Sequence, residues 1–193
     1  MNWKTVFNPF EKFDEKWLLL ASILTVIISI AMGYWSGTAF FSIYRINNVE
    51  IVSLQAIALP TLASFAFSII ILFILGKILN SKTRFIDIVN TVLLSQLILI
   101  ILQPIDQIPF INAAQKRMIL YSKNPTESIP LLDMSVMMGM ALLSLVLLTY
   151  SIAIFYNGFK TATNIKKWQH IVLFVVISLV TTLICQILTS KFI

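Results

Sequence analysis

The sequence has few charged residues, and its long apolar stretches have none. Asp, Glu, Lys and Arg make up 11% of the 193 residues, whereas a soluble domain carries about 25%. A bilayer core of about 30 Å is crossed by about 20 helical residues. Five uncharged stretches meet this requirement, and together they predict an integral membrane protein: residues 17–35, 54–75, 88–105, 134–155 and 171–188.

Cysteine and histidine are almost absent as well. The only cysteine is Cys185, which excludes an intrachain disulfide and a thiolate metal cage. The only histidine is His170, at the edge of the last apolar stretch. Intramembrane enzymes and ion-coupled carriers usually have ionisable residues inside their spans, because a charge in lipid is costly. We therefore expect no enzyme activity, no cofactor and no metal site.

The fold class follows from the length and the pattern of the apolar stretches. A transmembrane β-barrel would need segments of about ten residues with alternating polarity, and the sequence has none of this kind. It predicts an all-α polytopic bundle in two parts. Residues 1–16 form a cytoplasmic interfacial helix, and residues 17–193 form a domain of five transmembrane helices. A further amphipathic helix is expected in the loop at residues 106–133.

Basic residues give the chain a net charge of +6 and lie in every loop between the spans. Nine of them fall in the amino-terminal segment, the second loop and the fourth loop, against five on the opposite side. By the positive-inside rule the amino terminus is cytoplasmic and the carboxyl terminus is outside. The loops are suited to lipid headgroups, and no basic run is long enough for nucleic acid.

Aromatic side chains recur at helical spacing before the first span. Asn8 as N-cap, Pro9 at the first position and Glu11 at the third predict a short helix that begins at Asn8. Three interpretations are open. The helix lies in the membrane interface, its aromatic residues form a belt that anchors the first span, or they form a surface for a partner. Five residues form the expected stripe: Trp3, Phe7, Phe10, Phe13 and Trp17.

The third span carries three amides, Asn90, Gln96 and Gln103, with spacings of six and seven residues. These spacings bring the amides to broadly one side of a helix. Two interpretations are open. The amides hydrogen-bond neighbouring helices, or they line a polar pathway through the bundle.

Short motifs across most of the chain resemble bacterial members of the Yip1 family. They are Asn8, Pro9 and Phe10, the turn from Leu75 and Gly76 to Phe85, and Gly158, Phe159 and Lys160. The resemblance implies a five-helix membrane bundle with a cytosolic amino terminus. Eukaryotic relatives, which are linked to Rab GTPases, carry an Asp-Leu-x-Gly-Pro-like motif that this sequence lacks. We therefore expect a bacterial inner-membrane protein.

Two functions fit these observations. The first is a non-enzymatic protein that organises the membrane or binds lipids, a membrane-protein partner or a second copy of itself. The second is a permease or channel component that uses the polar residues of the third span.

Overall fold

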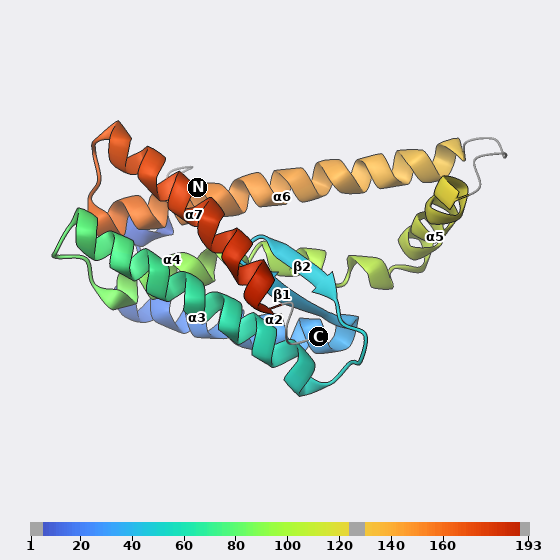
Figure 1. Cartoon of the computed structure of the whole chain (residues 1–193), viewed down its shortest axis with the longest axis horizontal. Helices are drawn as coiled ribbons and strands as arrows, with labels where there is room; N and C mark the ends of the chain where they lie inside the picture. The colour runs from blue at the N-terminus through green and yellow to red at the C-terminus, as the bar shows by residue number, and fades with distance from the viewer. Residues whose placement is uncertain (1–5, 124–129, 190–193) are drawn as a thin grey trace.

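The computed structural model describes residues 6–123 and 130–189. Every predicted span lies within a helical segment that is long and apolar enough to cross a membrane, which confirms the helical membrane bundle. Figure 1 shows the helices: α2 (Glu15–Ser36), α3 (Leu54–Leu79), α4 (Phe85–Gln96), α6 (Leu131–Thr163) and α7 (Trp168–Thr189).

The third span lies at the centre of the bundle and is not a regular helix throughout. Every residue from Asn90 to Gln96 is buried, and α4 packs against α2, α3 and α6. After Gln96 the span tightens into 3₁₀ turns, η2 (Leu99–Leu102) and η3 (Ile105–Gln107). Pro104 has no N–H to donate to the Ile100 carbonyl, which instead accepts from Gln103 N at 3.1 Å. The single helix predicted over 88–105 is therefore interrupted.

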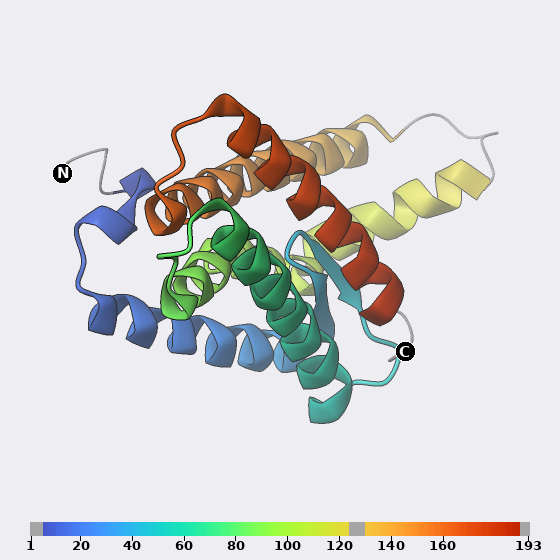
Figure 2. The ribbon, with the colours of Figure 1, turned by 60° about the vertical axis from the view of Figure 1, so that its left-hand side comes forward.

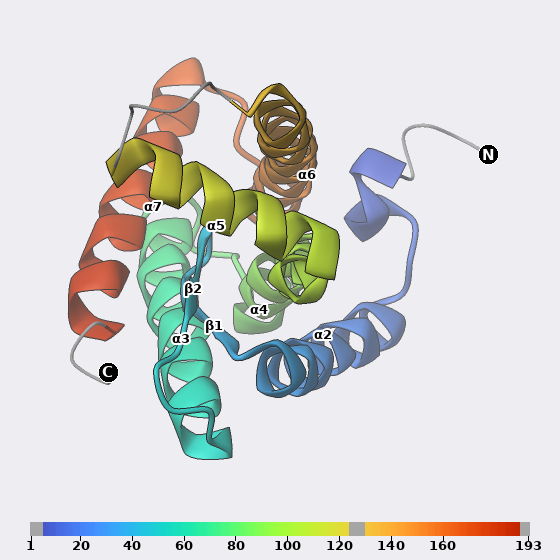
Figure 3. The same cartoon turned by 90° about the vertical axis from the view of Figure 1, so that its right-hand side faces the viewer.

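A β-hairpin, which the sequence analysis did not predict, follows α2. Gly37 ends the helix with a φ of 71°, a left-handed conformation that favours glycine. Strand β1 (Thr38–Ser42) then pairs antiparallel with β2 (Arg45–Asn48). All five β1 residues are buried, and β1 packs against α3, α7 and α2. Viewed along the long axis, the hairpin lies among the helices, beside α3 (Figure 3).

Helix side chains form hydrogen bonds with backbone groups of the buried strand β1. The Phe40 N–H donates to Thr61 Oγ1 at 3.2 Å, and Thr189 Oγ1 donates to the Phe41 carbonyl at 2.8 Å. The Phe40 ring packs against the Phe65 ring of α3, with the ring centroids 5.4 Å apart. Irregular backbone is tolerated at membrane depth where protein surrounds it and completes its hydrogen bonds. The bundle can therefore hold this strand pair in its interior.

The amphipathic helix expected in the third loop is confirmed as α5 (Pro109–Lys123). It packs against α6, where Arg117 Nε and Asp133 Oδ2 lie 2.6 Å apart. At about 1.5 Å per residue, the 33 residues of α6 extend about 50 Å, more than a bilayer core of about 30 Å. The amino-terminal half of α6, together with α5, projects beyond the other helices (Figure 1).

Candidate functional site at the amino-terminal end

The segment before α2 folds against α6. A short helix begins after Asn8 as predicted, but it is a single 3₁₀ turn, η1 (Pro9–Glu11), and the Asn8 side chain makes no capping hydrogen bond. Asn8 Nδ2 instead lies 3.4 Å from Thr161 Oγ1 of α6. Figure 2 shows this turn beside the carboxyl-terminal end of α6. The expected capping interaction was wrong: the contact with α6 uses Nδ2, and Oδ1, the atom that would accept the capping bond, has no hydrogen-bond partner among the described residues.

Two side chains of α6 fix the backbone of this segment. Tyr150 OH donates to the Val6 carbonyl at 2.8 Å, and Asn157 Nδ2 donates to the Phe7 carbonyl at 2.9 Å. The rings of Phe7 and Tyr150 also meet edge to face, with centroids 5.4 Å apart. These contacts fix the segment against α6, where it forms one side of the candidate site.

Gly158 allows the closest approach between this segment and α6. A Cβ at this position would lie 2.7 Å from Cε2 of Phe10 and 2.7 Å from Oγ1 of Thr91. Carbon atoms that are not bonded pack at about 3.5–4.0 Å. Any larger residue at position 158 would therefore displace the Phe10 ring or α4.

The structure does not gather the predicted aromatic stripe on one surface. Trp3 lies outside the described residues. Phe7 packs on Tyr150, and Phe10 is half-buried on Gly158. Phe13 and Trp17 are exposed by 50% and 66%. The use of this stripe as a partner surface stays a prediction.

Phe13 and Trp17 line an apolar groove between the amino-terminal segment, α2, α4 and α6. Its volume is about 390 Å³. Tyr150 is its most polar lining residue, and the tyrosine hydroxyl already donates to Val6. Other walls of the groove are Leu18, Ala21, Leu94 and Leu97. The groove is open to an apolar ligand.

A polar recess adjoins this groove, and Leu18 lines both. The recess has a volume of about 190 Å³ and is lined by Arg84, Asp87, Asn90 and Thr161, among others. Asn90 Oδ1 accepts a hydrogen bond from Ser22 Oγ at 2.9 Å. Polar groups and apolar walls therefore lie side by side at this end of the bundle.

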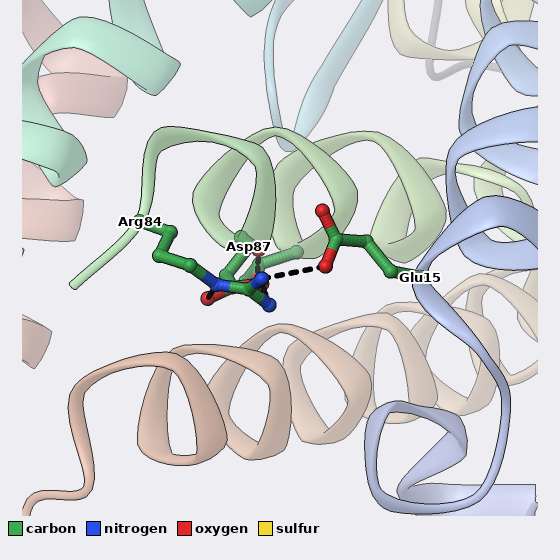
Figure 4. Close-up of polar contacts among 4 residues, drawn as sticks. Glu15, Arg84 and Asp87 are labelled. Carbon is green, nitrogen blue, oxygen red and sulfur yellow. Dashed lines mark hydrogen bonds and ion pairs between the residues drawn. The ribbon is translucent and has the colours of Figure 1, made fainter.

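Arg84 and Asp87 line the recess, and Glu15 of α2 pairs with Arg84 (Figure 4). Arg84 Nη1 lies 2.6 Å from Glu15 Oε2, and Arg84 Nε and Nη2 donate to Asp87 at 3.1 and 2.8 Å. Hydrogen bonds to Asp87 and then Glu15 raise the pKa of Arg84. The sequence analysis missed this group. The spacing of Arg84 and Asp87 at a helix start signals their pairing, but nothing local brings Glu15 to them.

The other two amides of the third span lie elsewhere. Gln96 Nε2 donates within its own helix, to Ser95 Oγ at 2.9 Å and the Val92 carbonyl at 3.3 Å. Gln103 Nε2 donates to the Ser29 carbonyl of α2 at 3.2 Å. Only Asn90 of the three lines the recess. The structure therefore brings Asn90 and two of the stripe aromatics to one site, without Gln96 or Gln103.

Within residues 6–123 and 130–189, no group of three or more His, Cys, Asp or Glu has an arrangement that could hold a metal ion. Five apolar helical segments surround buried hydroxyl and amide groups. These features define a polytopic α-helical membrane protein. The family model for the Yip1 domain matches residues 3–189, and the chain belongs to the Yip1 family. Comparisons with curated proteins and with solved structures gave no match.

Proposed function

We propose that this protein is a non-enzymatic membrane protein that binds a lipid at its amino-terminal end and in this way organises the surrounding membrane. The observation that carries the proposal is the adjacency of the apolar groove and the polar recess, which share Leu18 as a lining residue. A lipid has the same two parts, an apolar chain and a polar headgroup. The groove volume of about 390 Å³ falls within the usual range for ligand pockets, about 300–1,000 Å³.

The charges near the recess favour a lipid with an anionic headgroup. The second and fourth loops lie together, since Asn80 Nδ2 donates to the Thr163 carbonyl at 3.1 Å. Exposed basic residues at this end raise the local concentration of anionic lipids. They are Lys77, Lys82, Lys160, Lys166 and Lys167. Exposed Trp17 suits the boundary between headgroups and chains, where tryptophan is enriched.

The proposal includes a location, the bacterial inner membrane, and an orientation with the amino terminus in the cytoplasm. Nine basic residues on the amino-terminal side against five opposite support this orientation. The groove then faces the cytoplasmic leaflet, whose anionic lipids complement the basic loops.

Native mass spectrometry of protein extracted in polymer discs tests the proposal. Ala21 lines the groove, so Ala21→Phe fills it, whereas Ala31→Phe adds the same ring to an exposed position of the same helix. We expect the natural protein and Ala31→Phe to retain one lipid class and Ala21→Phe to lose it. Equal retention by both variants would contradict the proposal. A stoichiometric protein partner or a second copy, with no specific lipid, would support an organiser that acts through protein contacts.

One observation favours a permease as a second candidate. Asn90 lines the recess, Gln103 lines a cavity at the opposite end, and Gln96 is buried between them. If the amides line a path, a variant with leucine at all three positions should fold but should show no solute flux in proteoliposomes. Unchanged flux, or none in the natural protein, would exclude this role.

A further inference from the structure

A second and larger cavity lies at the hairpin end of the bundle, along the carboxyl-terminal part of the third span, and it shares no lining residue with the groove. Its volume is about 560 Å³. It lies between β2, the 3₁₀ turns of the third span and α6, and no residue of the amino-terminal segment lines it. Any ligand here is separate from the lipid proposed for the groove.

Two oxygen acceptors of this cavity have no donor in the described part of the chain. Gln103 is 1% exposed, and its Oε1 has no hydrogen-bond partner because only Nε2 is used, by Ser29. The Asp106 carboxylate forms no ion pair and no hydrogen bond with any described residue. The Gln103 acceptor is buried, and burial without a donor costs free energy, whereas Asp106 is half-buried. The cavity therefore favours a ligand that donates hydrogen bonds.

The charge of the lining indicates what kind of donor fits. Among the described residues, Asp106 is the only ionisable acid or base that lines the cavity besides the Tyr44 phenol, so this lining contains one carboxylate and no Lys, Arg or His. Arg45 lies next to the lining residues Tyr44 and Ile46 in the chain but does not line the cavity; its guanidinium donates to Asn47 Oδ1 at 3.1 Å and to Gln186 Oε1 at 2.9 Å. A positively charged ligand would balance the Asp106 carboxylate.

The rest of the lining indicates an organic ligand. Leucines of the third span and α6, including Leu102 and Leu148, form apolar walls, and Tyr44 presents an aromatic ring. A volume of about 560 Å³ is far above the approximately 30 Å³ share of one water molecule, so a bare metal ion would leave most of it unfilled. Tyrosine rings also attract ammonium groups held over their faces.

We propose that this cavity binds an organic ammonium ligand, a protonated amine on an apolar body. The amine donates to Asp106 and Gln103, and the apolar body contacts the leucines. Free amphiphilic amines and aminophospholipid headgroups share this chemistry.

The probe is 1-hexylamine, which is protonated at neutral pH, titrated into the purified full chain in detergent and followed by thermal unfolding. Hexan-1-ol has the same chain without the charge. Asp106→Asn removes the carboxylate, and Glu50→Gln removes an exposed carboxylate of the same end that does not line the cavity. We expect hexylamine, and not hexanol, to stabilise the natural protein and Glu50→Gln, with about tenfold weaker binding to Asp106→Asn.

A second variant keeps the test informative if Asp106→Asn fails to fold. Asn48 is an exposed lining residue, and Asn48→Asp adds a carboxylate to the cavity, so hexylamine should bind more tightly. Equal effects of hexylamine and hexanol, or no change with either variant, would overturn the proposal.

Displacement of hexylamine in lipid nanodiscs distinguishes a free amine from a lipid headgroup as the natural ligand. Displacement of hexylamine by phosphatidylethanolamine, and not by phosphatidylglycerol, would identify a lipid headgroup as the ligand. Displacement by neither lipid would identify a free amine. Displacement by both equally would contradict recognition of the ammonium group.

Discussion

Polar side chains within the spans join the helices of this bundle. Ser22 Oγ of α2 donates to Asn90 Oδ1, and the side chains of Gln103 and Gln107 donate to the backbone carbonyls of Ser29 and Ser36 on the same buried face of α2. On the other side, Ser151 Oγ of α6 donates to the Ser95 carbonyl at 2.7 Å. Lipid supplies no hydrophobic drive for helices to associate, so such hydrogen bonds and close packing assume that role.

Asn90→Leu should lower the stability of the bundle. It removes the 2.9 Å hydrogen bond from Ser22, and such bonds between membrane helices contribute about 0.6 kcal/mol, at most about 2. Thermal unfolding in detergent measures the change. Gln55→Leu, at an exposed position of α3, is the control. A loss equal to that of the control would show that Asn90 does not join the helices.

Arg84→Gln should weaken the attachment of α2 to the start of α4. Glu15 and Asp87 would then face each other without their shared cation. Because the side chain of Arg84 is 59% exposed, we expect a loss of less than about 1 kcal/mol. A double-mutant cycle with Glu15→Gln measures the coupling.

The pH dependence of this coupling provides a second check on Arg84. Its folded-state pKa is raised above the ordinary arginine value, so its contribution is complete below the unfolded-state pKa and is lost only as the pH rises through the higher folded value. The coupling should therefore stay constant from neutral pH to about pH 9. A decline within that interval would contradict the assignment.

At the scale of elements, hydropathy predicted the spans because lipid requires helices to be both long and apolar. The hairpin was missed, although residues 38–46 contain Phe40, Phe41, Ile43, Tyr44 and Ile46, a composition typical of strands. Nothing local shows that a strand will be buried among helices. The docking of residues 6–11 on α6 was missed for a related reason, since Val6 and Tyr150 lie 144 positions apart.

Phe40→Ala tests whether the buried hairpin is part of the core. Phe40 is 0% exposed and packs on Phe65, and removal of a buried phenylalanine side chain costs about 3–5 kcal/mol. Thermal unfolding should show a large loss, whereas Phe110→Ala, at a position 55% exposed, should show little. Similar small losses for the two variants would mean that the hairpin does not pack inside the bundle.

At the scale of the whole molecule, the recess and the larger cavity lie at opposite ends of the third span, and the groove borders the middle of the span at Leu94 and Leu97. The groove and recess adjoin the basic loops, and the larger cavity adjoins the hairpin. Sequence reasoning named Asn90, Phe13 and Trp17 but did not place them together, because their proximity depends on the packing of α2, α4 and α6. With the proposed orientation, the basic loops face the cytoplasm.

Cysteine labelling of intact cells tests this orientation. In a Cys185→Ser background, a membrane-impermeant maleimide should label Glu50→Cys at the hairpin end and leave Lys82→Cys in the second loop unlabelled until the cells are opened. Both positions are exposed. The reverse pattern would place the amino terminus outside.

The central claim is that a lipid occupies the groove beside the recess, and photo-crosslinking tests it most directly. An anionic phospholipid with a diazirine in its acyl chain is reconstituted with the protein, activated by light and mapped by peptide mass spectrometry. We predict that the label concentrates on Phe13, Trp17, Leu94 and Leu97, which line the groove, and that unlabelled anionic lipid competes for these positions. A label spread evenly over the exposed faces of α3 and α7, without competition, would contradict the account.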